Sequence, residues 1–137
     1  MDTAVVKYYR KLLRTRFEYA GSFENASIVL DSVGEKVHIC ENIGNFMHLY
    51  INVVNDTIDD IKYICTCDPT ANVAVEILCT LIKGRTLDEA IGITNQAFCQ
   101  FLGTADEELG KKAKGLLELL NTGITRYKAQ TSSNSCI

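Results

Sequence analysis

The sequence lacks any apolar run of the roughly 18–20 residues that a membrane-spanning helix requires. Its first residues also lack the basic region, apolar stretch and small-residue cleavage site of a secretory leader. Both absences indicate a cytoplasmic protein without a membrane partner. Thiols in that compartment stay reduced, so we expect the six cysteines to pack in the core or to bind metal. Cys79 and Cys99 lie in apolar helical stretches and are expected in the core.

The sequence also lacks an excess of positive charge, because the 137 residues carry a net charge of −3. This balance disfavours nucleic acid and anionic membranes as partners. Only two histidines are present, and the sequence contains no nucleophilic triad pattern and no glycine-rich phosphate loop, so nothing supports a hydrolase or a kinase. We therefore expect a binding protein and not an enzyme.

What the sequence does contain begins with a block of strand patterns. Residues 27–30 form a short run with β-branched side chains, and residues 46–54 and 58–65 alternate between apolar and polar side chains. The short turn Asn55-Asp56 between the last two runs predicts an antiparallel hairpin.

Apolar residues at helical spacing predict helices on both sides of the strands. Capping-box patterns at Thr86–Glu89 and Thr104–Glu107 mark two of the helix starts. The expected helices cover residues 3–17, 71–83, 86–92, 95–102 and 104 to about 127. These elements predict one α+β domain over residues 1–130, a small antiparallel three-stranded sheet with helices packed on it, and a disordered polar tail over residues 131–137.

The most distinctive chemistry lies in the Cys-x-Cys-Asp turn at residues 65–68, between the last strand and the next helix. A helix N-terminus supplies unpaired N–H groups and partial positive charge, which suit thiolates and metal-bound sulfur. In an extended segment Cys65 and Cys67 leave the same face, so both can contact one metal. Asp68 can cap the helix, with Pro69 at its first position.

Three segments suggest a family when they are taken together. Residues 81–90 read LIKGRTLDEA, residues 44–53 read GNFMHLYINV, and residues 8–13 read YYRKLL. Their order and spacing resemble the NifU/IscU-like iron–sulfur cluster scaffold family, which has Lys-Gly-Lys-Thr-x-x-Glu-Ala after its central helix and a strand that begins Gly-Asp. The resemblance extends from Tyr8 to Tyr127 and implies the α+β scaffold fold.

The resemblance also implies where cluster ligands would lie. The family assembles a cluster on three cysteines, with an aspartate beside the first and often a histidine before the third. Alignment on the shared segments puts Ile43 at the first cysteine and Asn45 at the aspartate. Asp68 falls at the second cysteine, one residue from Cys67.

The third cysteine position falls on Lys111 or Lys112, at the start of the last helix. The family's histidine and cysteine are therefore both absent there. Together with Lys114, these lysines are most simply the solvated face of that helix.

A displaced site with three thiols is one hypothesis for this chain. Cys40 lies three residues before the replaced first cysteine, so Cys40, Cys65 and Cys67 are candidate ligands for iron or a cluster, with Asp68 or His38 as the fourth donor. Zinc can occupy the same thiols. The alternative is structural: Cys65 is a buried strand residue, Cys67 and Asp68 form an ordinary strand-to-helix turn, and Cys40 lies at a strand edge.

The resemblance implies an iron–sulfur cluster assembly scaffold or carrier that binds iron or a cluster through cysteine thiolates and passes it on. The partners that it implies are a cysteine desulfurase, a chaperone pair and apo acceptor proteins. The alternative is a degenerate scaffold-fold protein without cluster assembly, which acts as an interaction or regulatory domain. The replacements at Ile43, Asn45 and the lysine position favour this alternative.

Overall fold

The computed structural model describes residues 3–31, 46–66 and 68–135. In this part of the chain one helix precedes three strands, and four helices follow them, as the sequence predicts. The elements are α1 (Thr3–Thr15), β1 (Ile28–Asp31), β2 (Met47–Val54), β3 (Thr57–Cys65), α2 (Pro69–Ile82), α3 (Leu87–Ile91), α4 (Asn95–Leu102) and α5 (Glu107–Ser135).

The three strands form one antiparallel sheet in the order β1-β2-β3. Asn55 and Asp56 join β2 to β3 with φ values of 52° and 59°, the left-handed pair that a type I′ hairpin turn requires. The predicted hairpin is therefore confirmed. In β2 the side chains of Met47, Leu49 and Ile51 are buried, so the predicted apolar face is the one that meets the core.

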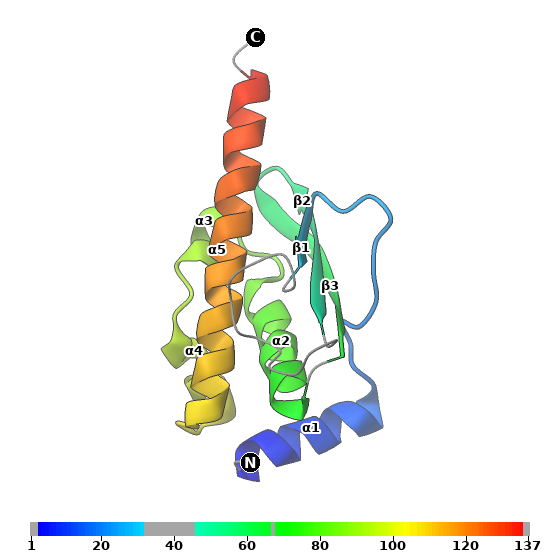
Figure 1. Cartoon of the computed structure of the whole chain (residues 1–137), viewed down its shortest axis with the longest axis vertical. Coiled ribbons are helices and arrows are strands. Elements are labelled where there is room, and N and C mark those ends of the chain that lie inside the picture. Colours follow the sequence, from blue (N-terminus) through cyan, green and yellow to red (C-terminus); the bar gives the residue numbers. More distant parts are fainter. Residues whose placement is uncertain (1–2, 32–45, 67, 136–137) are drawn as a thin grey trace.

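Helices cover one face of the sheet, which makes an α+β fold of two layers (Figure 1). Helix α2 lies at the centre and contacts α5, α1 and β3. Most of its side chains are buried, because neighbours surround it on several sides. Helix α5 runs along the length of the molecule beside α2, and α1 lies across the end of α2 (Figure 1).

A buried carboxylate supports the edge of the sheet. The backbone before β1 pairs with β3, with Tyr63 N donating to Tyr19 O at 2.9 Å. Beneath this pair Glu76 of α2 accepts hydrogen bonds from Tyr19 N at 3.2 Å and from the Tyr63 hydroxyl at 3.0 Å. Burial raises the pKa of the Glu76 carboxyl above its ordinary value.

The sequence predicts capping boxes at the starts of α3 and α5, and only the first prediction is confirmed. The capping box of α3 is present, with Glu89 N donating to Thr86 Oγ1 and Thr86 N donating to Glu89 Oε1. At α5 the predicted box at Thr104 is wrong, because Leu109 N donates to Asp106 Oδ2 at 2.8 Å and the helix begins at Glu107. An aspartate caps at least as well as a threonine, and Asp106 lies two residues closer to the apolar stripe.

Helix α5 also continues to Ser135, beyond the predicted end near Tyr127, so residues 131–135 of the expected polar tail are helical.

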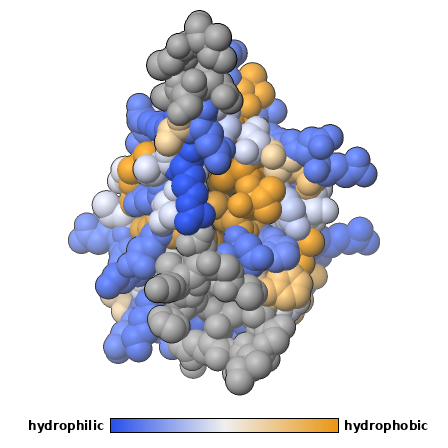
Figure 2. All heavy atoms as spheres, turned by 45° about the horizontal axis from the view of Figure 1, so that its top comes forward, coloured by the Kyte–Doolittle hydropathy of each residue, from blue (hydrophilic) through white to orange (hydrophobic). Residues whose placement is uncertain are grey.

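Among the described residues, no helix is both long and apolar enough to span a membrane. On the face shown in Figure 2, hydrophobic side chains form small groups that hydrophilic side chains separate.

A glycine allows α5 to approach the sheet closely. A Cβ atom at Gly123 would clash with Leu30 Cδ2 of β1 and would lie 3.2 Å from Leu30 Cγ, whereas a Cβ atom at Gly110 would meet nothing within 4 Å. We expect Gly123→Ala to lower the free energy of unfolding by about 1–3 kcal/mol through overpacking. Gly110→Ala is the matched control and should raise it by about 0.5–1 kcal/mol. Urea denaturation measures both, and stabilisation by both variants would contradict this packing.

The pKa of Glu76 predicts a pH dependence. Because the folded state raises this pKa, the carboxyl contributes stability that is full below its unfolded value and is lost as the pH rises through its folded value. Gln keeps the Oε1 acceptor but does not titrate. We expect Glu76→Gln to become more stable relative to the parent between pH 4 and pH 7, as measured by urea denaturation across that range. A constant difference between the two proteins would refute the shift.

Candidate functional site

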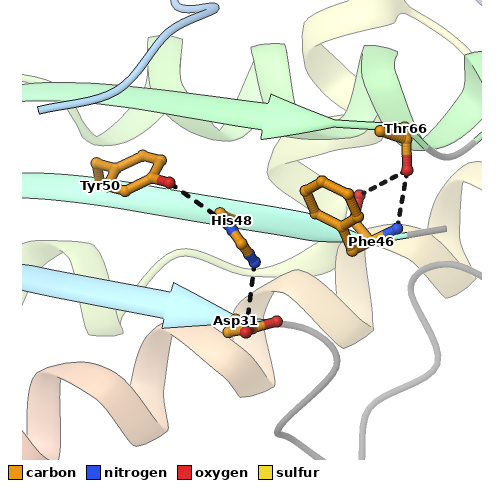
Figure 3. A network of polar contacts seen from close by, with 5 residues as sticks. All are labelled: Asp31, Phe46, His48, Tyr50 and Thr66. Carbon is orange, nitrogen blue, oxygen red and sulfur yellow. Dashed lines mark hydrogen bonds and ion pairs between the residues drawn. The ribbon is translucent and has the colours of Figure 1, made fainter. Parts of the chain in front are cut away.

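The Cys-x-Cys turn lies where β3 ends and α2 begins, and it is tied to the start of β2. Thr66 N donates to Phe46 O at 3.0 Å. Phe46 N also donates to the Thr66 hydroxyl at 2.9 Å (Figure 3). This pair continues the register of Met47 opposite Cys65. The turn is therefore held beside the strand that the family resemblance places after its first ligand.

Cys65 is the last residue of β3, and its partly buried side chain packs against the edge of the core. It shares the core side of the strand with Ile61 and Tyr63, as the alternation predicts. The other two candidate ligands, Cys40 and Cys67, lie outside the described residues. Cys79 is fully buried, as expected, and burial raises the pKa of its thiol well above the ordinary value.

Asp68 caps α2, as the sequence predicts. Its Oδ1 atom accepts a hydrogen bond from Ala71 N at 2.9 Å, and Pro69 occupies the start of the helix. The second carboxylate oxygen, Oδ2, lies 3.3 Å from Nζ of Lys112 in α5. One oxygen of this candidate metal ligand therefore already accepts from a backbone amide, and the other already contacts a cation.

Lys112 corrects the expectation that the lysines of α5 form a solvated face. Its side chain is only 1% exposed, whereas Lys111 and Lys114 are exposed as expected. The missed signal is helical spacing, because Lys112 lies three residues after Leu109 and four before Leu116, both of which are buried.

The fold thus brings together Asp68, which the resemblance assigns to the second cysteine, and Lys112, one of the two lysines that it assigns to the third. They form a pair of a carboxylate and an ammonium group, and Cys67 directly precedes Asp68 in the sequence. A metal ion on Asp68 would lie close to the Lys112 ammonium, and two cations at that separation repel each other. The ion pair joins α2 to α5, and Asp68 does not fit as a metal ligand while the pair is intact. Within the described ranges, no group of three or more His, Cys, Asp or Glu side chains is arranged to hold a metal ion.

A second polar network lies on the outer face of the sheet (Figure 3). His48 Nε2 lies 3.3 Å from Asp31 Oδ2, and the Tyr50 hydroxyl lies 3.4 Å from His48 Nδ1. The ring of Phe46 lies beside the imidazole, with 4.8 Å between the ring centroids. His48 is therefore part of a side-chain network and not a freely solvated histidine.

Comparisons with known proteins match this fold. The sequence model of the family described as "NifU-like N terminal domain" matches residues 16–134. A candidate iron–sulfur cluster assembly scaffold protein for the SUF system from Fervidobacterium islandicum AW-1 has a similar structure, with 18% identity, a TM-score of 0.62, and coverage of 90% of this chain and 96% of that one. The N-terminal part of a nitrogen-fixing NifU-like protein from Brucella abortus is similar at 10% identity and a TM-score of 0.61, with 93% and 94% coverage. A search of curated proteins gave no match.

Two substitutions at Asp68 separate its two contacts. Asn caps helices as well as Asp does, so Asp68→Asn removes only the charge that faces Lys112, and we expect a loss of about 2 kcal/mol in the free energy of unfolding. Asp68→Ala also removes the cap and should cost about 1 kcal/mol more. Asp106→Asn is the matched control, because Asp106 caps α5 without an ion pair among the described residues. Equal stability of Asp68→Asn and the parent in urea denaturation would show that the ion pair contributes nothing.

Proposed function

This chain belongs to the NifU-like N-terminal domain family, and on that premise we propose that it is a scaffold or carrier protein of iron–sulfur cluster assembly. The match over residues 16–134 is the observation that carries the proposal, because it includes the sheet and the helices that surround the Cys-x-Cys turn. The structural similarity to a candidate SUF scaffold supports the fold on which this role depends.

The proposed cargo is iron or an iron–sulfur cluster, held by the thiolates of Cys40, Cys65 and Cys67. Thiolates are the usual ligands of such clusters, and zinc prefers the same donors. Partial exposure of Cys65 supports a cargo that is passed on, because a fully buried ligand would hinder exchange. In this proposal Asp68 serves beside the cargo as the cap of α2.

The protein then binds and delivers, and it does not catalyse a reaction of its own. Its partners would be a cysteine desulfurase that supplies sulfur, a chaperone pair and apo proteins that accept the cluster. We place this work in the cytoplasm.

The Asp68–Lys112 ion pair favours a second candidate function. A buried cation where the family has a ligand is expected in a scaffold-fold protein that no longer assembles clusters and acts as an interaction or regulatory domain. This candidate also accounts for Ile43 and Asn45 at the other family positions.

Anaerobic reconstitution with ferric iron, sulfide and glutathione distinguishes the two functions. We expect the parent protein to gain stoichiometric iron and sulfide and the visible absorption of a cluster. Cys65→Ala and Cys67→Ala should each lose at least half of the bound iron, because each removes one thiolate ligand. Cys99→Ala, which changes a partly buried cysteine of α4, is the control and should keep the cluster.

A colourless parent protein without iron after this treatment would rule out the scaffold role and leave the interaction domain. Equal cluster content in all four proteins would show that the cluster does not bind at the turn.

A further inference from the structure

A cleft between α1 and α2 has no part in the proposed function. Its volume is about 300 Å³, which lies at the lower end of the range for small-molecule sites. Its lining includes side chains with polar or charged ends, namely those of Tyr8, Lys11, Arg16, Glu18, Glu76 and Thr80. None of these residues belongs to the Cys-x-Cys turn. The cleft is therefore a separate place in which a molecule can bind.

Glu76 forms the buried end of the cleft, and its side chain is only 1% exposed. Its Oε1 atom accepts the hydrogen bonds from Tyr19 N and the Tyr63 hydroxyl, so Oε2 has no donor among the described residues. Oε2 is also not sealed in the core, because the only sealed side-chain oxygen or nitrogen without a partner in the described ranges is Asn121 Oδ1. This second oxygen therefore faces the cleft, where a buried carboxylate oxygen needs a hydrogen-bond donor.

The surroundings of Oε2 favour an ammonium group as that donor. Burial raises the pKa of the Glu76 carboxyl, and the charge of Glu18 adds to the shift, so a positive group bound here would offset both effects. Burial and the nearby Glu76 charge raise the pKa of the Tyr8 phenol, so its hydroxyl stays protonated beside the carboxylate. An ammonium group has three donors, and oxygens of Glu76, Tyr8 and Thr80 line the cleft as acceptors for them.

The mouth of the cleft carries the opposite charge. Lys11 and Arg16 are exposed there, and neither forms an ion pair with a described residue. Arg16 directly follows α1 with a φ of 64°, a left-handed conformation in which glycine is the usual residue. The arginine is therefore strained, and strained residues are common at binding sites. Both cations are available to a negative group of a bound molecule.

We propose that this cleft binds a free amino acid, with the ammonium group on Glu76 and the carboxylate on Lys11 and Arg16. A molecule with both charges is complementary to both ends of the cleft. A simple anion would meet the Glu76 carboxylate, and a simple amine would leave the cations at the mouth without a partner. Arginine binds carboxylates through two parallel hydrogen bonds, which gives the mouth a preference for this group. The inference does not depend on cluster binding and adds a small-molecule site to the proposed function.

Isothermal titration calorimetry of the full chain tests the proposal. The probes are the common L-α-amino acids, β-alanine and γ-aminobutyrate, which differ in the distance between their two charges. We expect at least one of them to bind with a Kd below about 1 mM. N-acetylation of that amino acid removes the ammonium charge and amidation removes the carboxylate, so each change should weaken binding at least tenfold. Absence of binding by every probe, or equal binding of the blocked forms, would overturn the proposal.

Substitutions then locate the site. Glu76→Gln keeps Oε1 as the acceptor for Tyr19 N and places an amide donor at the position of Oε2, so it should weaken binding at least tenfold. Arg16→Gly removes a cation and the strain of its positive φ, so it should weaken binding at least fivefold in a protein that resists urea better than the parent. A loss of affinity in this variant therefore cannot come from unfolding. Arg14→Ala changes an exposed cation of α1 outside the cleft and should bind like the parent. Parental affinity in either Glu76→Gln or Arg16→Gly would overturn the site.

Discussion

A buried ammonium group needs a counter-charge, and Lys112 has one in the carboxylate that caps α2. This requirement links the two helices that dominate the helical layer, because α5 must lie where Lys112 reaches the first turn of α2. The contact between Gly123 and Leu30 further along α5 brings the same helix close to β1. One polar contact and one close apolar contact thus add to the buried apolar side chains that hold α5 over α2 and the sheet.

The same ion pair lies at the start of α2, directly after the Cys-x-Cys segment. The family resemblance assigns cluster ligands to these positions, and the structure shows a carboxylate paired with a buried ammonium group there. The proposed function is a scaffold or carrier whose cluster is bound by thiolates, and the competing function is a domain that has lost its cluster.

Much of the fold could be predicted from the sequence, because each of the patterns used has one physical cause. Alternation identified the buried face of β2, and Asn55-Asp56 predicted the tight hairpin, because few other residues accept two positive φ values. The burial of Lys112 was not predicted, because a charged residue suggests a solvated face unless its partner is known. That partner, Asp68, is 44 residues away in the sequence, and only the tertiary fold brings them together. The cap at Asp106 was missed for a local reason. Thr104 and Asp106 lie two positions apart, and both residue types cap helices well.

The central claim is that this chain serves as a scaffold that binds an iron–sulfur cluster through cysteine thiolates. Native mass spectrometry of the unmodified chain after anaerobic reconstitution tests it most directly. The account predicts that the main species has the mass of the protein with an iron–sulfur core. A main species with the mass of the protein alone would contradict it.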